Sequence, residues 1–194
     1  MDLPVIVAIV AAALLILVGV STYNRVARLR HRTANARHQV EVQLARRHDL
    51  IPNLVEVVRG AMEHERETLE ALARARHDAI AGLQVGAGSP ASTAAEARLS
   101  TALGSLISFV EAHPELKALG NVRALQEELS STENRIAFAR QHYNDAATAF
   151  NVVRDQFPAG LFVRRSEVAP LWEMPEGSAD VPEVNLRLGV AANA

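Results

Sequence analysis

The sequence predicts an all-α fold: an N-terminal transmembrane helix, then an antiparallel up-and-down bundle of long helices, then an irregular C-terminal tail. Three observations predict it. An apolar run opens the chain, apolar residues beyond it recur at helical intervals, and prolines and glycines gather after Pro158. We therefore expect an anchor at residues 1–22, a cytoplasmic helical bundle at residues 23–158, and an irregular tail at residues 159–194 that is free or docked.

The composition is sufficient for one hydrophobic core and excludes the kinds of site that need cysteine. With 194 residues, 49% of them hydrophobic but only 4% aromatic, that core must consist mainly of Leu, Val, Ile and Ala. Cysteine is absent, which excludes disulfides and thiolate metal sites. The net charge of −2 hides an asymmetry, because eight arginines face three acidic residues between Ser21 and Met62 while the rest of the chain is acidic. A basic region beside the most apolar segment favours a membrane surface over nucleic acid as partner.

The expected anchor is the run from Leu3 to Val20, eighteen residues without a charged side chain. At about 1.5 Å per residue it spans roughly 27 Å, and a helix continued through Thr22 reaches the ~30 Å of a bilayer core. A cleaved signal peptide is the alternative. It would need a basic leader and a small-residue cleavage site, whereas Met1 and Asp2 precede the run and no such site follows it. We expect a retained anchor.

The segment that follows the anchor predicts the topology. It contains Arg25, Arg28, Arg30, Arg32 and Arg37 with no acidic residue among them. The positive-inside rule keeps such a flank in the cytoplasm, so the N-terminus should lie outside and the rest of the chain inside. The same arginines can contact anionic lipid headgroups, which we interpret as incidental to their role in topology.

Beyond the anchor, four apolar series repeat every three or four residues, as one face of an α-helix does. They begin at Val26, Leu54, Leu99 and Val122. The first series continues the membrane helix without a visible break. We expect the second helix to begin at Asp49 and, like the fourth, to contain about 34 residues, on the order of 50 Å. Helices of that length need partners along their length, which an antiparallel bundle supplies.

Turn and capping residues separate these helices. A loop is expected at Gly82, Gly86, Gly88, Ser89 and Pro90, followed by a capping box made of Thr93 and Glu96. The His113-Pro114 step should end the third helix, because the residue before a proline is disfavoured in the helical region. Asn121 is the expected N-cap of the fourth helix.

The stretch ARRHDLIPNLVEVV places several polar residues beside a proline, and it is either a working site or a helix start. Asp49 is a favoured N-cap residue, and Pro52 then falls in the first turn, where no backbone donor is needed; Arg47 and Asn53 belong to the same motif. His48 and Asp49 are poor metal ligands together, because adjacent helical residues point about 100° apart. We interpret the stretch as the start of the second helix.

Other candidate sites lack an essential part. His64-Glu65 begins like a zinc-protease helix, but Thr68 stands where the second histidine belongs. Gly86 and Gly88 have neither the preceding strand nor the lysine of a phosphate-binding loop. No motif marks a nucleophile. We expect no catalytic, cofactor or metal site, and no enzymatic activity.

A repeat in the fourth helix stands out. Tyr143-Asn144 and Phe150-Asn151 are seven residues apart, so both aromatics share one face and both amides the next. The polar residues that flank this region are Glu133, Asn134 and Arg140. We interpret the set as buried polar groups that fix the register of the bundle, a known role of isolated polar residues in helical interfaces. The alternative is a polar groove for a partner peptide.

The tail differs in character from the bundle. Prolines at positions 170, 175 and 182 should break any helix there. Its larger apolar residues are Leu161, Phe162, Leu171 and Trp172. They are too apolar for a fully solvated segment, so we expect contact with the chain's own bundle; the alternative is a neighbouring subunit. The stretch VPEVNLRL can add as a strand to a partner's sheet edge.

Two long stretches identify a family. VQLARRHDLIPNLVEVVRGAMEHE, residues 42–65, and LQEELSSTENRIAFARQHYNDAATAFN, residues 125–151, resemble the LemA family of bacterial membrane proteins. Tyr23-Asn24 after the apolar run and AHPELKA at residues 112–118 fit the same pattern, so the resemblance covers nearly the whole chain to Pro158. The chain departs from it in lacking an aromatic residue near Ala61 and a tryptophan near residue 35.

The resemblance implies a single-pass protein of the bacterial inner membrane with its N-terminus outside and a cytoplasmic antiparallel bundle. It implies no reaction, cofactor or substrate. We expect a membrane-tethered scaffold that binds an unidentified membrane or cytoplasmic protein, or copies of itself, and that is accessory to membrane stress or membrane proteolysis. The expected partners are therefore the bilayer and proteins, without nucleic acid. The alternative is a lipid-active or enzymatic factor that uses the basic juxtamembrane helix.

Overall fold

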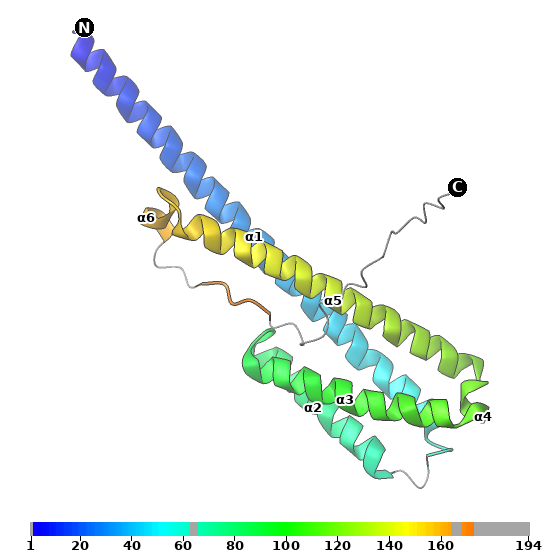
Figure 1. The fold of residues 1–194 in the computed structure, drawn as a ribbon. Helices are drawn as coiled ribbons and strands as arrows, with labels where there is room; N and C mark the ends of the chain where they lie inside the picture. The colour runs from blue at the N-terminus through cyan, green and yellow to red at the C-terminus, as the bar shows by residue number, and fades with distance from the viewer. Residues whose placement is uncertain (1, 63–65, 164–167, 173–194) are drawn as a thin grey trace, which may run out of the picture.

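The computed structural model of the chain describes residues 2–62, 66–163 and 168–172 (Figure 1). All regular structure in these ranges is helical, which confirms the all-α prediction. The elements in chain order are α1 (Leu3–Val58), α2 (Arg66–Gly86), α3 (Pro90–Ala112), α4 (Pro114–Lys117), α5 (Gly120–Asp155) and α6 (Ala159–Val163).

Helix α1 has 56 residues and joins the apolar segment to the bundle without a break. Its N-terminal part extends beyond every other element (Figure 1), and none of its most apolar window is buried within the chain. By length and composition this part can cross a membrane. The first buried residue is Val26, where the contacts with the bundle begin. The expectation that the apolar helix continues into the bundle is confirmed.

The bundle consists of two antiparallel pairs. Helix α5 runs back along the second half of α1, and α2 and α3 form a hairpin against the end of that pair farthest from the apolar segment (Figure 1). Helix α6 lies at the opposite end of α5, on the side of the apolar segment. The apolar series of each helix face one another across these contacts, so the 3.6-residue period accounts for the packing.

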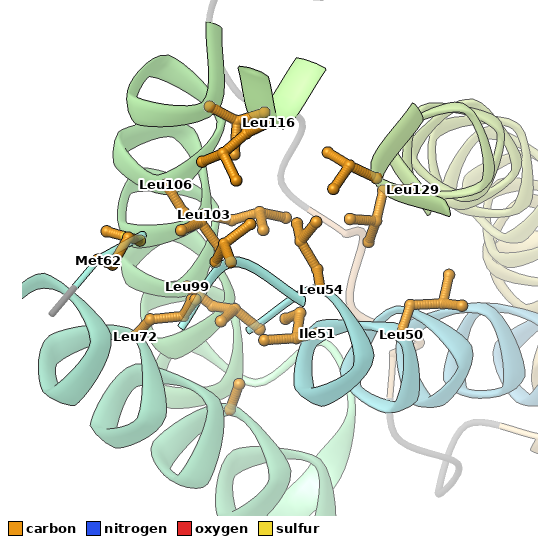
Figure 2. Packing of buried hydrophobic residues seen from close by; sticks show 14 residues of the cluster. Leu50, Ile51, Leu54, Met62, Leu72, Leu99, Leu103, Leu106, Leu116 and Leu129 are labelled. Carbon is orange, nitrogen blue, oxygen red and sulfur yellow. The ribbon is translucent and has the colours of Figure 1, made fainter. Parts of the chain in front are cut away.

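The largest core cluster lies where all four long helices meet. Figure 2 shows Ile51 and Leu54 of α1 pointing toward Leu99 and Leu106 of α3, with Leu129 of α5 alongside. These side chains are at most 2% exposed. The cluster is almost entirely aliphatic, as the composition predicts, and truncation of one such leucine to alanine typically costs about 2–5 kcal/mol.

Two smaller clusters continue along the axis toward the apolar segment. The middle cluster contains Val40, Leu44, Ile136, Tyr143 and Trp172. The last cluster contains Val26, Phe150, Val153, Ala159 and Val163. Both include residues from beyond α5, so part of the region expected to be an irregular tail belongs to the core, and residues 159–163 are helical rather than irregular.

The predicted start of a helix at Asp49 is wrong. Helix α1 passes through this residue and ends only at Val58, followed by Gly60, which has the weakest helix propensity after proline. The expected second helix of about 34 residues is therefore divided between the last turns of α1 and a shorter α2 of 21 residues.

Pro52 sits inside α1 because a neighbouring helix supplies the missing donor. A proline has no backbone N–H, so the carbonyl of His48 loses its helical partner four residues on. Nε of Arg76 in α2 donates to that carbonyl oxygen at 2.7 Å. The helix thus continues past the proline with its acceptor satisfied.

Of the other predicted helix boundaries, some are confirmed and some are wrong. The loop before Pro90 and the end of α3 at His113 are confirmed, but Gly82, which was expected in that loop, lies inside α2. The capping box of Thr93 and Glu96 is wrong, because Ser89 is the N-cap and its hydroxyl accepts from the Ser92 backbone N–H at 3.2 Å. The N-cap of α5 is Leu119 rather than Asn121.

Candidate functional site

A buried ionic network, centred on Arg47, joins three helices. Arg47 of α1 is 1% exposed and forms ion pairs with Glu96 of α3 and Glu133 of α5. Its guanidinium also donates to Oγ of Ser100 at 3.0 Å. Nε2 of His48 lies 2.9 Å from the second carboxylate oxygen of Glu96. Each oxygen of the Glu96 carboxylate therefore has its own partner, and the two partners, Arg47 and His48, are consecutive residues of α1.

The network keeps Glu96 ionised. Burial by itself raises the pKa of this carboxyl, but the hydrogen bond with His48 and the charge of Arg47 together outweigh burial and hold the pKa below its ordinary value. Nearby, burial and the charge of Arg47 lower the pKa of Arg140. The group therefore consists of paired opposite charges, in which Arg47, His48 and Glu96 are buried and Glu133 is partly exposed.

This arrangement suits a structural role better than a reaction. His48 and Glu96 are each 2% exposed, so a substrate would have no route to this histidine–carboxylate pair. Within the described residues there is also no group of three or more side chains placed to hold a metal ion. A buried ion pair adds little over apolar packing, but it defines which helices meet and in what register.

The residues of the ARRHDLIPNLVEVV motif lie on different faces of α1. Arg47 is the centre of the network, whereas Asp49, Pro52 and Asn53 are exposed on the other face of α1. The helix-cap role assigned to Asp49 is thus wrong. Glu96 is a network residue that sequence reasoning missed. Its signal was present, because Glu96 stands three residues before Leu99, on the apolar face of α3.

A second polar group holds the chain's own segment 168–172 against α5. The amide of Asn151 donates to the Ala169 carbonyl at 2.9 Å and accepts from the Ala169 N–H at 3.0 Å. The amide of Asn144 pairs in the same way with Trp172, at 3.0 Å and 2.7 Å. The Tyr143 hydroxyl donates to the Pro170 carbonyl at 2.8 Å. We call these three α5 side chains the tail clamp.

Trp172 is the buried side chain of the clamped segment. It is 2% exposed and meets the ring of Tyr143 edge-on, with centroids 5.9 Å apart. The guanidinium of Arg140 lies 5.6 Å above its ring, within cation–π range. Gly88 closes the pocket, since a Cβ there would lie 3.0 Å from the indole. Its φ of +81° independently favours glycine.

These contacts correct the register hypothesis. Asn144 and Asn151 face segment 168–172 and not another helix, and Asn134 is exposed outside the clamp. Glu133 does join helices, through Arg47, while Tyr143 and Phe150 are buried as expected. The amide contacts match the alternative, a polar groove for a peptide, with the chain's own segment as the peptide.

The expected docking of the tail is confirmed at Trp172. Leu171 is 54% exposed and does not contribute to the core. The side chains of Leu161 and Phe162 and the expected strand at residues 181–188 lie outside the described residues.

The juxtamembrane arginines occupy the opposite end of the bundle from the α2–α3 hairpin. Arg25, Arg28, Arg30 and Arg32 are all exposed, and among the described residues no acidic side chain pairs with them. Three of them line an open pocket of about 810 Å³ between α1 and the end of α5, which Val152 and Gln156 complete. The site is basic and adjoins the apolar segment.

A family model and two curated proteins are similar to this chain. The LemA family model matches residues 36–186. Among curated proteins, Magnetosome protein MamQ 1 and Magnetosome protein MamQ 2 of Paramagnetospirillum magneticum are each 24% identical over 163 residues. Each match covers 70% of this chain and 58% of the relative, so the chain spans little more than half the length of these curated relatives.

Proposed function

Because this chain belongs to the LemA family, we propose that it is a membrane-tethered scaffold whose cytoplasmic bundle binds other proteins or copies of itself and has no catalytic activity of its own. Family membership and the apolar helix make it a membrane-associated protein of LemA type. The tethered scaffold, its cytoplasmic orientation in the bacterial inner membrane and its partners are the proposal.

One observation carries it: the apolar segment and the central bundle helix are a single helix. Helix α1 passes from exposed apolar residues to residues packed on α5 with no linker between them. A flexible linker would let a tethered domain rotate freely, whereas a continuous helix holds it at a set height and angle. Such a joint suits a protein that presents surfaces near a membrane.

We propose no catalytic role because the candidate ionisable side chains are mostly buried. Among the described residues, the densest group of ionisable side chains lies around Arg47; it is internally paired, and all of its members except Glu133 are buried. The orientation rests on the arginines after the apolar segment and the positive-inside rule. The LemA resemblance adds membrane stress and membrane proteolysis as the processes that the scaffold would assist.

Photo-cross-linking in intact cells tests the scaffold. A photoreactive residue at Phe138, which is 76% exposed on α5, reports on contacts of the bundle surface. We expect discrete adducts of defined mass, with a second copy of the chain or another protein. A matched probe at Leu99, which is fully buried, should give none. Monomer alone at Phe138 and at the other exposed positions of α5 would contradict the scaffold.

A lipid-active role is the second candidate, and the basic pocket favours it. Arg25, Arg28 and Arg32 line a pocket beside the apolar segment, where each arginine near an anionic membrane contributes on the order of 1 kcal/mol. The purified chain in nanodiscs with and without anionic lipid tests this role. A substitution of all three arginines by glutamine that leaves lipid composition around the protein unchanged would exclude it.

A further inference from the structure

The tail clamp recognises a peptide backbone by its repeat distance. Asn144 and Asn151 are seven residues apart, which is about 10.5 Å along a helix axis at 1.5 Å per residue. Ala169 and Trp172 are three residues apart, which is about 10 Å in an extended chain at 3.3 Å per residue. The two asparagines therefore match every third residue of an extended segment that runs antiparallel to α5.

Each amide uses both of its hydrogen-bonding groups on the backbone of one residue. Such a pair of bonds is what a neighbouring strand would form, and it does not depend on the side chain of the bound residue. Only proline is excluded at the two clamped positions, because the N–H is needed. Pro170 lies between them and offers only its carbonyl, which Tyr143 uses. The clamp thus accepts many sequences in one conformation.

Side-chain selectivity is confined to the pocket of Trp172. Arg140 and Tyr143 contact the ring and favour an aromatic residue. The indole Nε1 is buried without an acceptor among the described residues, so none of these residues selects tryptophan through its N–H. Phenylalanine would fill much of the same pocket without leaving a donor unpaired.

The chain's own segment has few other contacts that would make it irreplaceable. Val168, Pro170 and Leu171 are exposed, and Trp172 is the one fully buried side chain of the five described residues. A segment of another protein that supplies the same backbone and one aromatic side chain would reproduce nearly all of these contacts.

We propose that the groove formed by the tail clamp and the Trp172 pocket is a peptide-binding site, and that residues 168–172 are its exchangeable ligand in cis. Its partner is an extended segment of another protein with non-proline residues at two positions three apart and an aromatic side chain at the second. The proposal rests on the proposed scaffold function and names the chemistry of one partner.

The only tryptophan of the chain reports directly on the exchange. The full-length protein in detergent micelles is titrated with a tryptophan-free peptide, residues 166–174 with the change Trp172→Phe. We expect a saturable red shift of the protein's emission as Trp172 leaves its pocket for water. The matched control peptide also carries Ala169→Pro, which deletes the N–H that Asn151 binds, and should require at least tenfold higher concentration.

A second measurement uses a variant in which the chain's own segment 168–172 competes less strongly for the groove. A fluorescein-labelled peptide with the native sequence 166–174 is titrated into the full-length Trp172→Ala variant, whose helix content is checked by circular dichroism. We expect binding at least tenfold tighter than to the wild-type chain, and loss of that binding when Asn144→Ala and Asn151→Ala are added. If Trp172→Ala does not fold, Ala169→Pro replaces it, because this change weakens the cis segment without opening a cavity.

Absence of saturable binding to the folded variant, or equal binding after loss of both asparagines, would overturn the proposal. These outcomes are separable from failure of the scaffold. Cross-links from Phe138 in cells without peptide binding to the groove would leave the scaffold standing and reject the peptide site alone.

Discussion

The ionic network and the tail clamp are both polar groups on helices of one bundle, yet they differ in charge, burial and partner. Arg47 and Glu96 are charged, almost fully buried and paired within the bundle. Asn144 and Asn151 are neutral, half-buried and paired with the backbone of a segment outside it. A charged pair cannot be opened without leaving a buried charge, whereas a neutral amide can exchange one backbone for another or for water. The ionic contacts therefore define the bundle, whereas the amide contacts can be replaced.

The largest effect should follow from opening the network. Arg47→Ala leaves Glu96 and Glu133 without their shared cation and should lower the free energy of unfolding by about 3–5 kcal/mol. Urea titration of the full chain in detergent, followed by circular dichroism, measures it. The neighbouring Arg46 provides a matched control, because its 2.7 Å pair with Glu128 is exposed and its loss should cost less than about 1 kcal/mol. Equal losses in the two variants would contradict the difference in burial.

An intermediate effect is expected at the pocket of Trp172. Gly88→Ala adds a Cβ at 3.0 Å from the indole and strains a positive φ, so it should cost about 1–2 kcal/mol and shift the tryptophan emission to the red. Gly104→Ala is the control with the opposite sign. A Cβ added there would meet no atom within 4 Å outside the adjacent backbone of its own helix, so the change should stabilise α3 by roughly 0.5–1 kcal/mol. Unchanged emission in Gly88→Ala would show that Gly88 does not pack against the indole of Trp172.

Smaller effects should follow from single losses in the clamp. Asn144→Ala or Asn151→Ala removes two neutral hydrogen bonds from a half-exposed segment, and each should weaken docking by about 1 kcal/mol. The emission of Trp172 measures the released fraction, while the urea midpoint of the helices should hardly move. Asn134→Ala, an exposed amide of the same helix, should change neither. An identical result for all three variants would show that the amides do not hold the segment.

The mildest test changes only pH. Because the folded-state pKa of Glu96 lies below its ordinary value of 4.5, the carboxylate stabilises the fold above that pH, and this contribution is lost as pH falls through the folded pKa. The wild-type chain should therefore lose stability on acidification below about pH 4.5. Glu96→Gln should be less stable at neutral pH and show a shallower acid dependence. A parallel acid dependence in the two proteins would place the titrating group elsewhere.

Local sequence signals predicted several helix boundaries correctly. They failed where a residue distant in sequence determines whether a helix continues. The apolar run, the loop before Pro90 and the His113-Pro114 boundary depend on nearby residues alone, and all three are present, although the loop begins after Gly82. Asp49 and Pro52 also looked like a helix start by local rules. Arg76 of another helix changes that outcome by donating to the carbonyl that the proline leaves free.

The two polar groups show the same limit. Glu96 had the spacing of a capping box, and its partners Arg47 and His48 are nearly fifty residues away in sequence. The asparagine repeat was recognisable from its seven-residue spacing, but its ligand was not. Segment 168–172 has no periodic pattern, since it binds through backbone groups that every residue except proline possesses.

Cysteine labelling in intact cells tests the central claim, a bundle held on the cytoplasmic side of a membrane by α1, most directly. The chain contains no cysteine, so each introduced thiol is the only one. With a membrane-impermeant maleimide, Asp2→Cys should react in intact cells, and Ser105→Cys on the exposed face of α3 should react only after permeabilisation. Leu15→Cys, within the apolar segment, should resist in both conditions. Labelling of Ser105→Cys in intact cells would contradict the account.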